Sequence, residues 1–136
     1  MTEPAFLVDT NVLVDVFFDD PIWSNWSADQ LDRASATGPL AINDIVYAEL
    51  AVQSPSMEAL DQSLGAAQIS IAGMPRAALF LAGKAFQRYR SAGGPRTSLL
   101  PDFFIGAQAS VMGIPLLTRD ARRYRTYFPS LAVIAP

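Results

Sequence analysis

The chain has 136 residues, 51% of them hydrophobic, which fits one compact domain over residues 1–136 with a single active or binding site. It contains no cysteine and no histidine, which excludes disulfides, thiolate or imidazole metal ligands and histidine-activated nucleophiles. The net charge of −3 is unevenly distributed: residues 1–75 hold 11 acidic residues and one basic, whereas residues 76–136 hold two acidic and nine basic. Hydrolytic chemistry must therefore rest on carboxylates. The basic second half can engage a polyanion locally, although Arg76, Lys84, Arg88 and Arg90, each taken alone, are better interpreted as residues on the solvated faces of helices.

The N-terminal residues lack the basic stretch and apolar core of a signal peptide. No apolar run approaches the roughly 18 residues of a membrane span. We therefore expect an unexported, cytoplasmic protein without membrane contact, and the absence of cysteine agrees with that location.

The first half of the chain alternates short apolar runs with helical patterns. The predicted elements are a strand over 5–8, a helix after residue 11, a helix over 23–36, a strand over 40–42, a helix from 43 to about 52, a helix over 57–64 and a strand over 68–71. Asn11 and Asn43 are candidate N-caps, and Gly65 is the candidate end of the helix before it. Asp9 stands directly after the first buried strand.

The second half begins with a long amphipathic helix over 75–91. Its apolar face holds, at helical spacing, Ala78, Leu81, Ala82, Ala85 and Tyr89. The elements predicted after it are a loop over 92–100, a helix over 101–112 ended by Gly113, a strand over 115–118, a short helix after Asp120 and a strand over 132–134.

Strands that alternate with helices predict the fold class. Parallel strands need crossover helices, so the pattern indicates a three-layer α/β/α sandwich with a central parallel sheet of about four to five strands. In open α/β sheets the ligand crevice lies at the carboxyl ends of the strands. We therefore look for functional side chains just after the predicted strands.

Acidic side chains follow two of these strands, and two more lie on helices with apolar neighbours. The set, called here the acidic quartet, consists of Asp9, Glu49, Asp102 and Asp120. Each could have a simpler role: Asp102 and Asp120 as helix N-caps, Glu49 as a surface residue and Asp9 as an acceptor of helix amides. Together, four neighbouring carboxylates would repel one another, so they need compensating positive charge.

A hard divalent cation supplies that charge, and an all-oxygen ligand set favours Mg²⁺ or Mn²⁺. Metal ions held by carboxylates activate water and stabilise charge during phosphodiester hydrolysis. With a basic second half, the pattern therefore indicates phosphodiester hydrolysis.

Four stretches carry a family resemblance over nearly the whole chain: LVDTNVLVD, AINDIVYAEL, PDFFIGAQA and GIPLLTRD. The sequence resembles the PIN-domain ribonucleases, and among them the VapC-like toxins of bacterial toxin–antitoxin pairs. The resemblance implies that the acidic quartet binds Mg²⁺ or Mn²⁺, that Asn11 orients Asp9 or water, and that Thr118 is a supporting polar residue. It also implies an RNA substrate, a homodimer and a small antitoxin partner. The family usually has Ser or Thr near Asn43, and Asn can still cap the helix.

Two further groups have two interpretations each. Arginines around the site are either RNA-phosphate contacts or ordinary surface residues: Arg96, Arg119, Arg122, Arg123 and Arg125. Aromatic residues are either base-stacking platforms or, as we favour, packing residues: Trp23, Trp26, Tyr47 and Phe103. Other acids in helices and turns are interpreted as solvated: Asp15, Asp19, Asp20, Asp29 and Asp32.

The leading hypothesis is a metal-dependent endoribonuclease that acts as a toxin. The alternative is a catalytically silent PIN-like domain that binds nucleic acid or a partner. A phosphatase of the haloacid-dehalogenase type also begins with a strand-end aspartate, but it needs a second acid where this chain has Asn11. It also needs a suitably placed lysine, whereas Lys84 lies within a predicted helix, so this third hypothesis is disfavoured.

Overall fold

The computed structural model describes residues 3–94 and 100–136, and its centre is a five-stranded sheet in the order β3-β2-β1-β4-β5. The strands are β1 (Phe6–Val8), β2 (Leu40–Ile42), β3 (Ile69–Ile71), β4 (Leu116–Leu117) and β5 (Val133–Ile134). All neighbouring strands pair in parallel. The predicted parallel sheet is confirmed.

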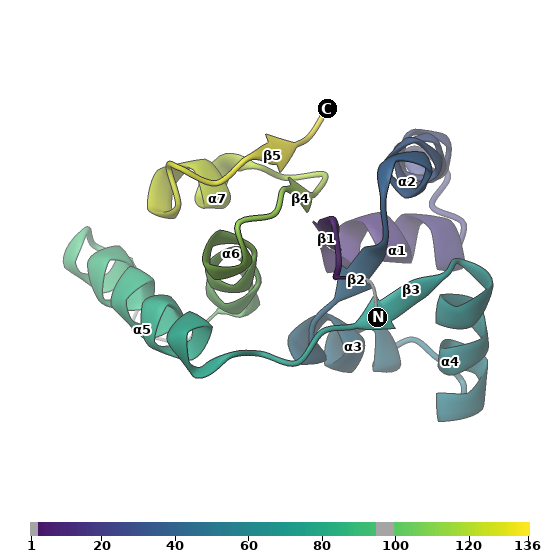
Figure 1. Cartoon of the computed structure of the whole chain (residues 1–136), viewed down its shortest axis with the longest axis horizontal. Coiled ribbons are helices and arrows are strands. Elements are labelled where there is room, and N and C mark those ends of the chain that lie inside the picture. Colours follow the sequence, from purple (N-terminus) through teal and green to yellow (C-terminus); the bar gives the residue numbers. More distant parts are fainter. Residues whose placement is uncertain (1–2, 95–99) are drawn as a thin grey trace.

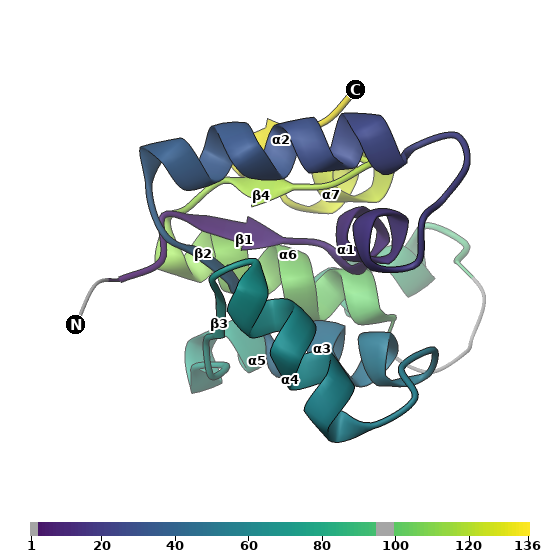
Figure 2. The ribbon, with the colours of Figure 1, turned by 90° about the vertical axis from the view of Figure 1, so that its right-hand side faces the viewer.

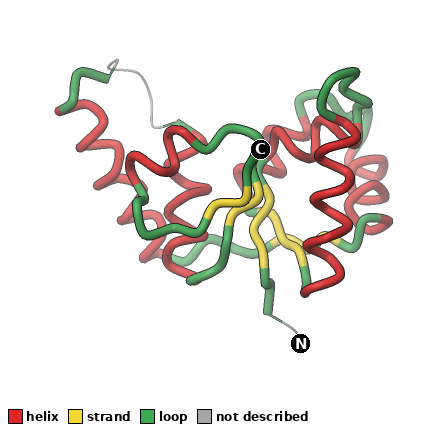
Figure 3. The backbone as a smooth tube through the Cα atoms, turned by 90° about the horizontal axis from the view of Figure 1, so that it is seen from above, coloured by secondary structure: helices red, strands yellow, loops and turns green. Residues whose placement is uncertain are grey.

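Helices cover both faces of this sheet. They are α1 (Thr10–Phe17), α2 (Ser24–Thr37), α3 (Asp44–Ala51), α4 (Met57–Ala66), α5 (Arg76–Ser91), α6 (Pro101–Met112) and α7 (Arg122–Tyr127). The helices α1 to α4 lie on one side and α5 to α7 on the other (Figure 1). Figure 3 shows the strands between these two groups, and Figure 2 shows the side that carries α1, α2 and α4. The predicted three-layer α/β/α sandwich is therefore confirmed.

The strands are short and apolar because they are buried on both faces. All three residues of β2 are buried, as are Leu7 and Val8 of β1 and both residues of β4. Val8 of β1 is in register with Leu117 of β4. The residues that follow these two strands, Asp9 and Thr118, therefore start from the same edge of the sheet.

The helix ends agree with the sequence patterns at some points and differ at others. Asn43 caps α3, since its side chain accepts a hydrogen bond of 2.9 Å from the amide of Val46. Gly113 ends α6 in the left-handed conformation, as predicted. The N-cap of α1 is Asp9 rather than Asn11, because the Asp9 carboxylate accepts from the first helical amide, that of Thr10. The end predicted at Gly65 is also wrong, because α4 continues to Ala66.

Gly106 in the middle of α6 allows α7 to pack closely against it. A Cβ atom added at Gly106 would lie 2.5 Å from the ring of Phe128 and 3.0 Å from the ring of Tyr124. Both rings belong to the buried core. Gly106 therefore allows α7 to lie close to α6, whose first turn carries Asp102.

None of the helices in the described ranges is long and apolar enough to cross a membrane. The predicted loop over 92–100 contains residues 95–99, which lie outside the described residues, and so does Arg96.

Candidate active site at the carboxyl edge of the sheet

The candidate site lies next to β1, where the strand order of the sheet reverses: β2 and β3 are added on one side of β1, and β4 and β5 on the other. β1 pairs with β2 on one side and with β4 on the other, so the connections that leave β1 and enter β4 run over opposite faces. A crevice opens outside the carboxyl ends of strands at such a switch point. Asp9 follows β1 and Thr118 follows β4, which places both residues at the edge of the sheet where this crevice lies.

Asp9 is the central side chain of the site and is only 5% exposed. Its Oδ2 accepts hydrogen bonds from the hydroxyls of Thr118 (2.7 Å) and Tyr124 (2.8 Å), and its Oδ1 accepts from the amide of Thr10 (2.7 Å). Burial raises the pKa of Asp9 to about 6, and the nearby Asp102 carboxylate adds to the rise, although the hydroxyl bonds oppose it. The carboxylate thus sits in a place that would favour a nearby cation.

The other three carboxylates each have a different local partner. The hydroxyl of Thr10 donates to Oε1 of Glu49. Oδ2 of Asp102 forms an ion pair of 2.9 Å with Arg123, and Oδ1 of Asp120 accepts a hydrogen bond of 3.3 Å from the amide of Arg122.

The acidic quartet lines one cleft of about 390 Å³. Its members come from four separate segments: the end of β1, the middle of α3, the first turn of α6 and the residues after β4. The cleft is completed by Thr10, Asn11, Val14 and Arg119. The structure thus brings together all four acids that the sequence patterns selected.

The simpler role of helix N-cap, considered for Asp102 and Asp120, is only partly supported by the structure. The N-cap of α6 is Leu100, so Asp102 lies inside the first helical turn and is not a cap. Asp120 precedes the N-cap of α7, Ala121, yet it accepts the amide of Arg122. A capping role therefore does not account for the acidic residue at position 102.

Asn11 and Thr118 support the site from two sides. Oδ1 of Asn11 accepts the amide of Arg119 (3.0 Å), and its Nδ2 lies 3.4 Å from the hydroxyl of Thr118. Thr118 is fully buried and contacts Asp9 directly. Asn11 thus reaches Asp9 through Thr118, and in this structure it forms no direct hydrogen bond to that carboxylate.

Tyr124 is a site residue that the sequence analysis missed. It is 1% exposed, its hydroxyl donates to Asp9, and burial together with the charge of Asp9 raises its pKa well above the ordinary value. It remains a neutral donor at physiological pH. Its signal in the sequence was weak: an aromatic residue among the arginines and threonine of ARRYRTYF gives no indication of a buried contact.

Asp15 was interpreted as solvated, and that interpretation is wrong. The residue is fully buried in α1 and forms two bonds with Arg119: Nε to Oδ2 at 2.9 Å and a terminal nitrogen to Oδ1 at 3.0 Å. Ser27 adds a third bond of 2.7 Å. The sequence held a signal, since helical spacing puts Asp15 on the same face as Val12, which is buried.

The donor chemistry of the cleft fits a hard cation. All side chains of the quartet offer carboxylate oxygens, and Oδ1 of Asp9 carries a single hydrogen bond. Within residues 3–94 and 100–136, no three acidic side chains converge closely enough to hold one ion. Mg²⁺ commonly keeps several waters and binds proteins through one or two carboxylates, and the carboxylate oxygens of the quartet are the ligand type that it prefers.

The family is decided by a match that spans most of the chain. The family model of the PIN domain matches residues 6–129 of this chain. The chain belongs to the PIN domain family. Comparison with curated proteins gives no significant match.

Solved structures agree with a PIN domain fold. The chain is similar to VapBC2 from Rickettsia felis bound to a promoter DNA fragment, with a TM-score of 0.73, 19% identity and coverage of 96% of this chain and 98% of the other. It is similar to a DNA-bound VapBC from Salmonella typhimurium (TM-score 0.70, 16% identity, 98% of each chain). A toxin–antitoxin complex from Klebsiella pneumoniae matches with a TM-score of 0.68, 23% identity and 94% of each chain.

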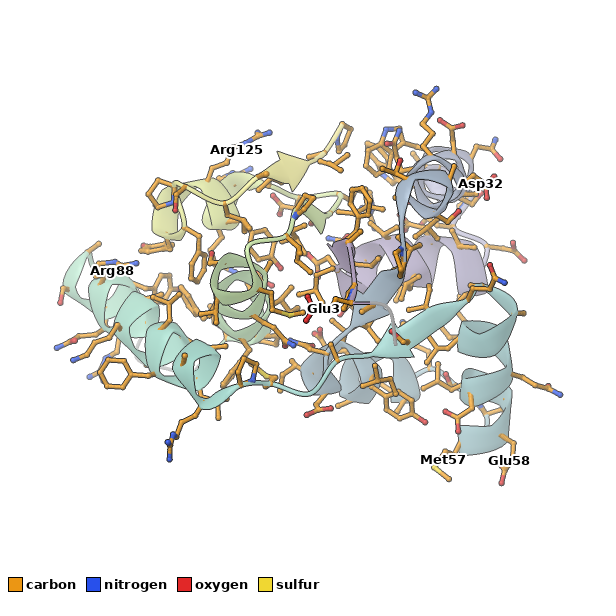
Figure 4. All side chains as sticks on the ribbon, viewed as in Figure 1. Glu3, Asp32, Met57, Glu58, Arg88 and Arg125 are labelled. Atoms are coloured by element: carbon orange, nitrogen blue, oxygen red, sulfur yellow. The ribbon has the colours of Figure 1, made fainter. Side chains whose placement is uncertain are left out.

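Charge is segregated in this PIN domain. The exposed Arg88 of α5 and Arg125 of α7 lie on one side of the molecule, and Asp32 of α2 and Glu58 of α4 on the other (Figure 4). The uneven charge of the two chain halves is thus also an uneven charge in space.

The aromatic candidates for base stacking have packing roles where the contacts are described. Phe103 is fully buried between the rings of Phe86 and Tyr127. The ring of Trp23 lies 5.4 Å from the guanidinium of Arg119, next to the Asp15 pair.

Proposed function

We propose that the chain is a metal-dependent endoribonuclease that hydrolyses RNA phosphodiester bonds. The observation that carries this proposal is the cleft in which four carboxylates from four segments gather, with the buried Asp9 among them. Their mutual repulsion at one edge of the sheet favours a bound cation. Membership of the PIN domain family supports a nuclease.

We propose Asp9, Glu49, Asp102 and Asp120 as the residues that hold Mg²⁺ or Mn²⁺. When bound, such an ion activates water and offsets charge on the phosphate. The neutral hydroxyls of Thr118 and Tyr124 fix the orientation of Asp9 by occupying its Oδ2. Asn11 holds Thr118 and the backbone of Arg119 in place, and so acts as a positioning residue.

The biological role that we propose is that of a toxin, inhibited by a small antitoxin. Its support is the similarity to VapBC complexes and to the Klebsiella pneumoniae toxin–antitoxin complex. We further propose a single domain over residues 1–136, a homodimer and a cytoplasmic location, as expected for members of this group.

An RNA cleavage assay tests the proposal. The purified chain, free of any antitoxin, should cut single-stranded RNA with Mg²⁺ or Mn²⁺ and lose this activity in excess EDTA. Asp9→Asn should lower the rate by about 10³-fold or more, since it removes the central carboxylate. Asp32→Asn is the matched control, because Asp32 lies exposed on α2 and does not line the cleft.

The second candidate is a catalytically silent domain that binds nucleic acid or a partner. It is favoured by the ion pair between Asp102 and Arg123, which satisfies one acid without a metal. Intact RNA after incubation with Mn²⁺, together with no Mn²⁺-dependent rise in the unfolding temperature, would favour this candidate and refute the first.

A further inference from the structure

A second hollow adjoins the acidic cleft. It has a volume of about 230 Å³ and shares Asp102 and Asp120 with the cleft. The remaining lining residues all come from α7: Arg122, Arg123, Thr126 and Tyr127. We call it the arginine hollow. Its volume is below the roughly 300 Å³ at which pockets for whole small molecules begin, so it suits one part of a longer ligand.

The two arginines leave donors available in this hollow. Arg123 uses one terminal nitrogen for Asp102 (2.9 Å), and its guanidinium lies 5.7 Å from the centre of the Tyr89 ring, which fixes its position. Within the part of the chain that the structure describes, the guanidinium of Arg122 has no ion pair. A guanidinium carries five N–H donors in a planar fork that matches two phosphate oxygens. The pair can therefore accept an anion.

The hollow also contains a fixed aromatic ring. Tyr127 is half-buried and packs edge-on against Phe103, with ring centres 5.5 Å apart and an angle of 72°. A second edge contact joins it to Tyr89 at 5.9 Å. Rings held in this way offer a stacking surface to a nucleobase at small entropic cost. Cationic groups beside an aromatic ring are the combination that binds single-stranded nucleic acid.

The position of the hollow sets its relation to the cleft. The arginine hollow and the acidic cleft share Asp102 and Asp120 and are therefore contiguous. Neighbouring phosphates of one RNA strand can occupy the two sites. We propose that the arginine hollow is a nucleotide subsite, in which Arg122 and Arg123 bind an RNA phosphate next to the one that is cut. This proposal rests on the proposed RNA substrate. It assigns Arg122 a direct contact with RNA and distinguishes it from Arg125 of the same helix, which does not line the hollow.

Arg125 provides a matched control. It lies on the same helix, is exposed like Arg122 and does not line the hollow. Arg122→Gln and Arg125→Gln therefore remove the same charge from the same element. Both side chains are exposed, so both variants should keep the wild-type unfolding temperature.

The test measures RNA binding in EDTA, so that it does not depend on cleavage. A fluorescent single-stranded RNA is titrated at several salt concentrations. Arg122→Gln should weaken binding about five- to tenfold, and should lower the slope of log affinity against log salt by about 0.7, the value for one phosphate of a single strand. Arg125→Gln should leave the slope unchanged. Equal changes in both variants would mean a diffuse charge effect and would overturn the subsite.

A second experiment identifies the phosphate. A set of RNA oligomers carries one uncharged methylphosphonate each, moved along the strand. Wild-type protein should bind one of them several-fold more weakly than the rest, and Arg122→Gln should not distinguish that oligomer. If the wild type and Arg122→Gln show the same profile, the subsite is wrong even where RNA is cleaved normally. If RNA is not cleaved with Mn²⁺ but the profiles differ, the subsite stands and the proposed nuclease activity fails.

Discussion

Two arginine–carboxylate pairs flank the cleft, and they differ in the burial of the carboxylate and in the number of hydrogen bonds. On the α1 side, Arg119 meets Asp15 through two bonds, and the Asp15 side chain is 0% exposed. On the α7 side, Arg123 meets Asp102 through one bond, and the two side chains are 38% and 34% exposed. Both pairs join segments separated in the sequence, yet only the first has a carboxylate that is shielded from water, while its Arg119 side chain is 31% exposed.

The difference shows how one type of contact can serve two purposes. Breaking a buried pair leaves a charge without water or a partner, so loss of the Asp15 pair should be strongly destabilising. An exposed pair contributes little to stability because water and salt compete with it. Asp102 can therefore exchange its arginine for another cation, whereas Asp15 cannot. The Asp15 pair holds Arg119, the residue next to Asp120, in place. The Arg123 pair leaves the carboxylate of Asp102 available to another cation.

The largest expected effect is on stability and comes from the buried pair. Asp15→Asn should lower the free energy of unfolding by about 3–5 kcal/mol, because the guanidinium of Arg119 loses its buried partner. Urea unfolding followed by circular dichroism measures the change. The matched variant Asp102→Asn should alter stability by less than about 1 kcal/mol. Equal losses in the two variants would show that burial does not distinguish the pairs.

The next effect concerns Asp9, which has no arginine partner among the residues that the structure describes. Its pKa of about 6 in the folded protein exceeds the ordinary value of 3.8. Between these two pH values the folded protein binds a proton that the unfolded chain has lost, so stability falls as pH rises through this window. Above pH 6 the buried charge should cost at most about 3 kcal/mol.

Asp9→Asn should accordingly raise the unfolding free energy at pH 7.5 in EDTA, and this gain should disappear towards pH 4. The sign is opposite to that of Asp15→Asn, although both changes remove one buried carboxylate. Urea unfolding at a series of pH values tests it. A loss of stability in Asp9→Asn at pH 7.5 would mean that the charge of Asp9 is already compensated in the metal-free protein.

The smallest expected change in the free energy of unfolding comes from breaking the exposed pair between Arg123 and Asp102. Arg123→Gln should change the unfolding free energy by less than about 1 kcal/mol, and that change should shrink between about 0.05 and about 1 M NaCl because salt screens exposed charges. Arg119→Gln should show a large loss that does not depend on salt. Thermal unfolding in both salt concentrations separates the two. A salt-independent loss in Arg123→Gln would contradict the assignment of its pair as exchangeable.

The parts of this protein that the sequence predicted are those that local patterns determine. Short apolar runs that end near an acidic residue predicted the positions of β1 and β4. The alternation of predicted strands with predicted helices indicated the parallel sheet. Asp9 was found because a carboxylate directly after a buried strand must be met by helix amides, by a cation or by both. The choice between Asp9 and Asn11 as the cap of α1 could not be made locally, since both residue types cap helices well.

The missed contacts depend on how distant elements cross. Tyr124 reaches Asp9 only because Gly106 lets α7 approach α6, and neither residue shows this in its own segment. The partner of Asp15 is 104 residues away, so no local pattern could name Arg119. The buried position of Asp15 was nevertheless readable from helical spacing, and a buried acid requires a compensating partner somewhere in the fold.

The contact between Asp9 and Tyr124 spans 115 residues of sequence. During synthesis the chain emerges from its N-terminus, so Asp9 leaves the ribosome long before the hydroxyl that orients it. The cleft cannot be complete until α7 has emerged and packed against α6. The hydroxyl bond from Tyr124 that orients Asp9 is therefore among the last contacts of the candidate site to form.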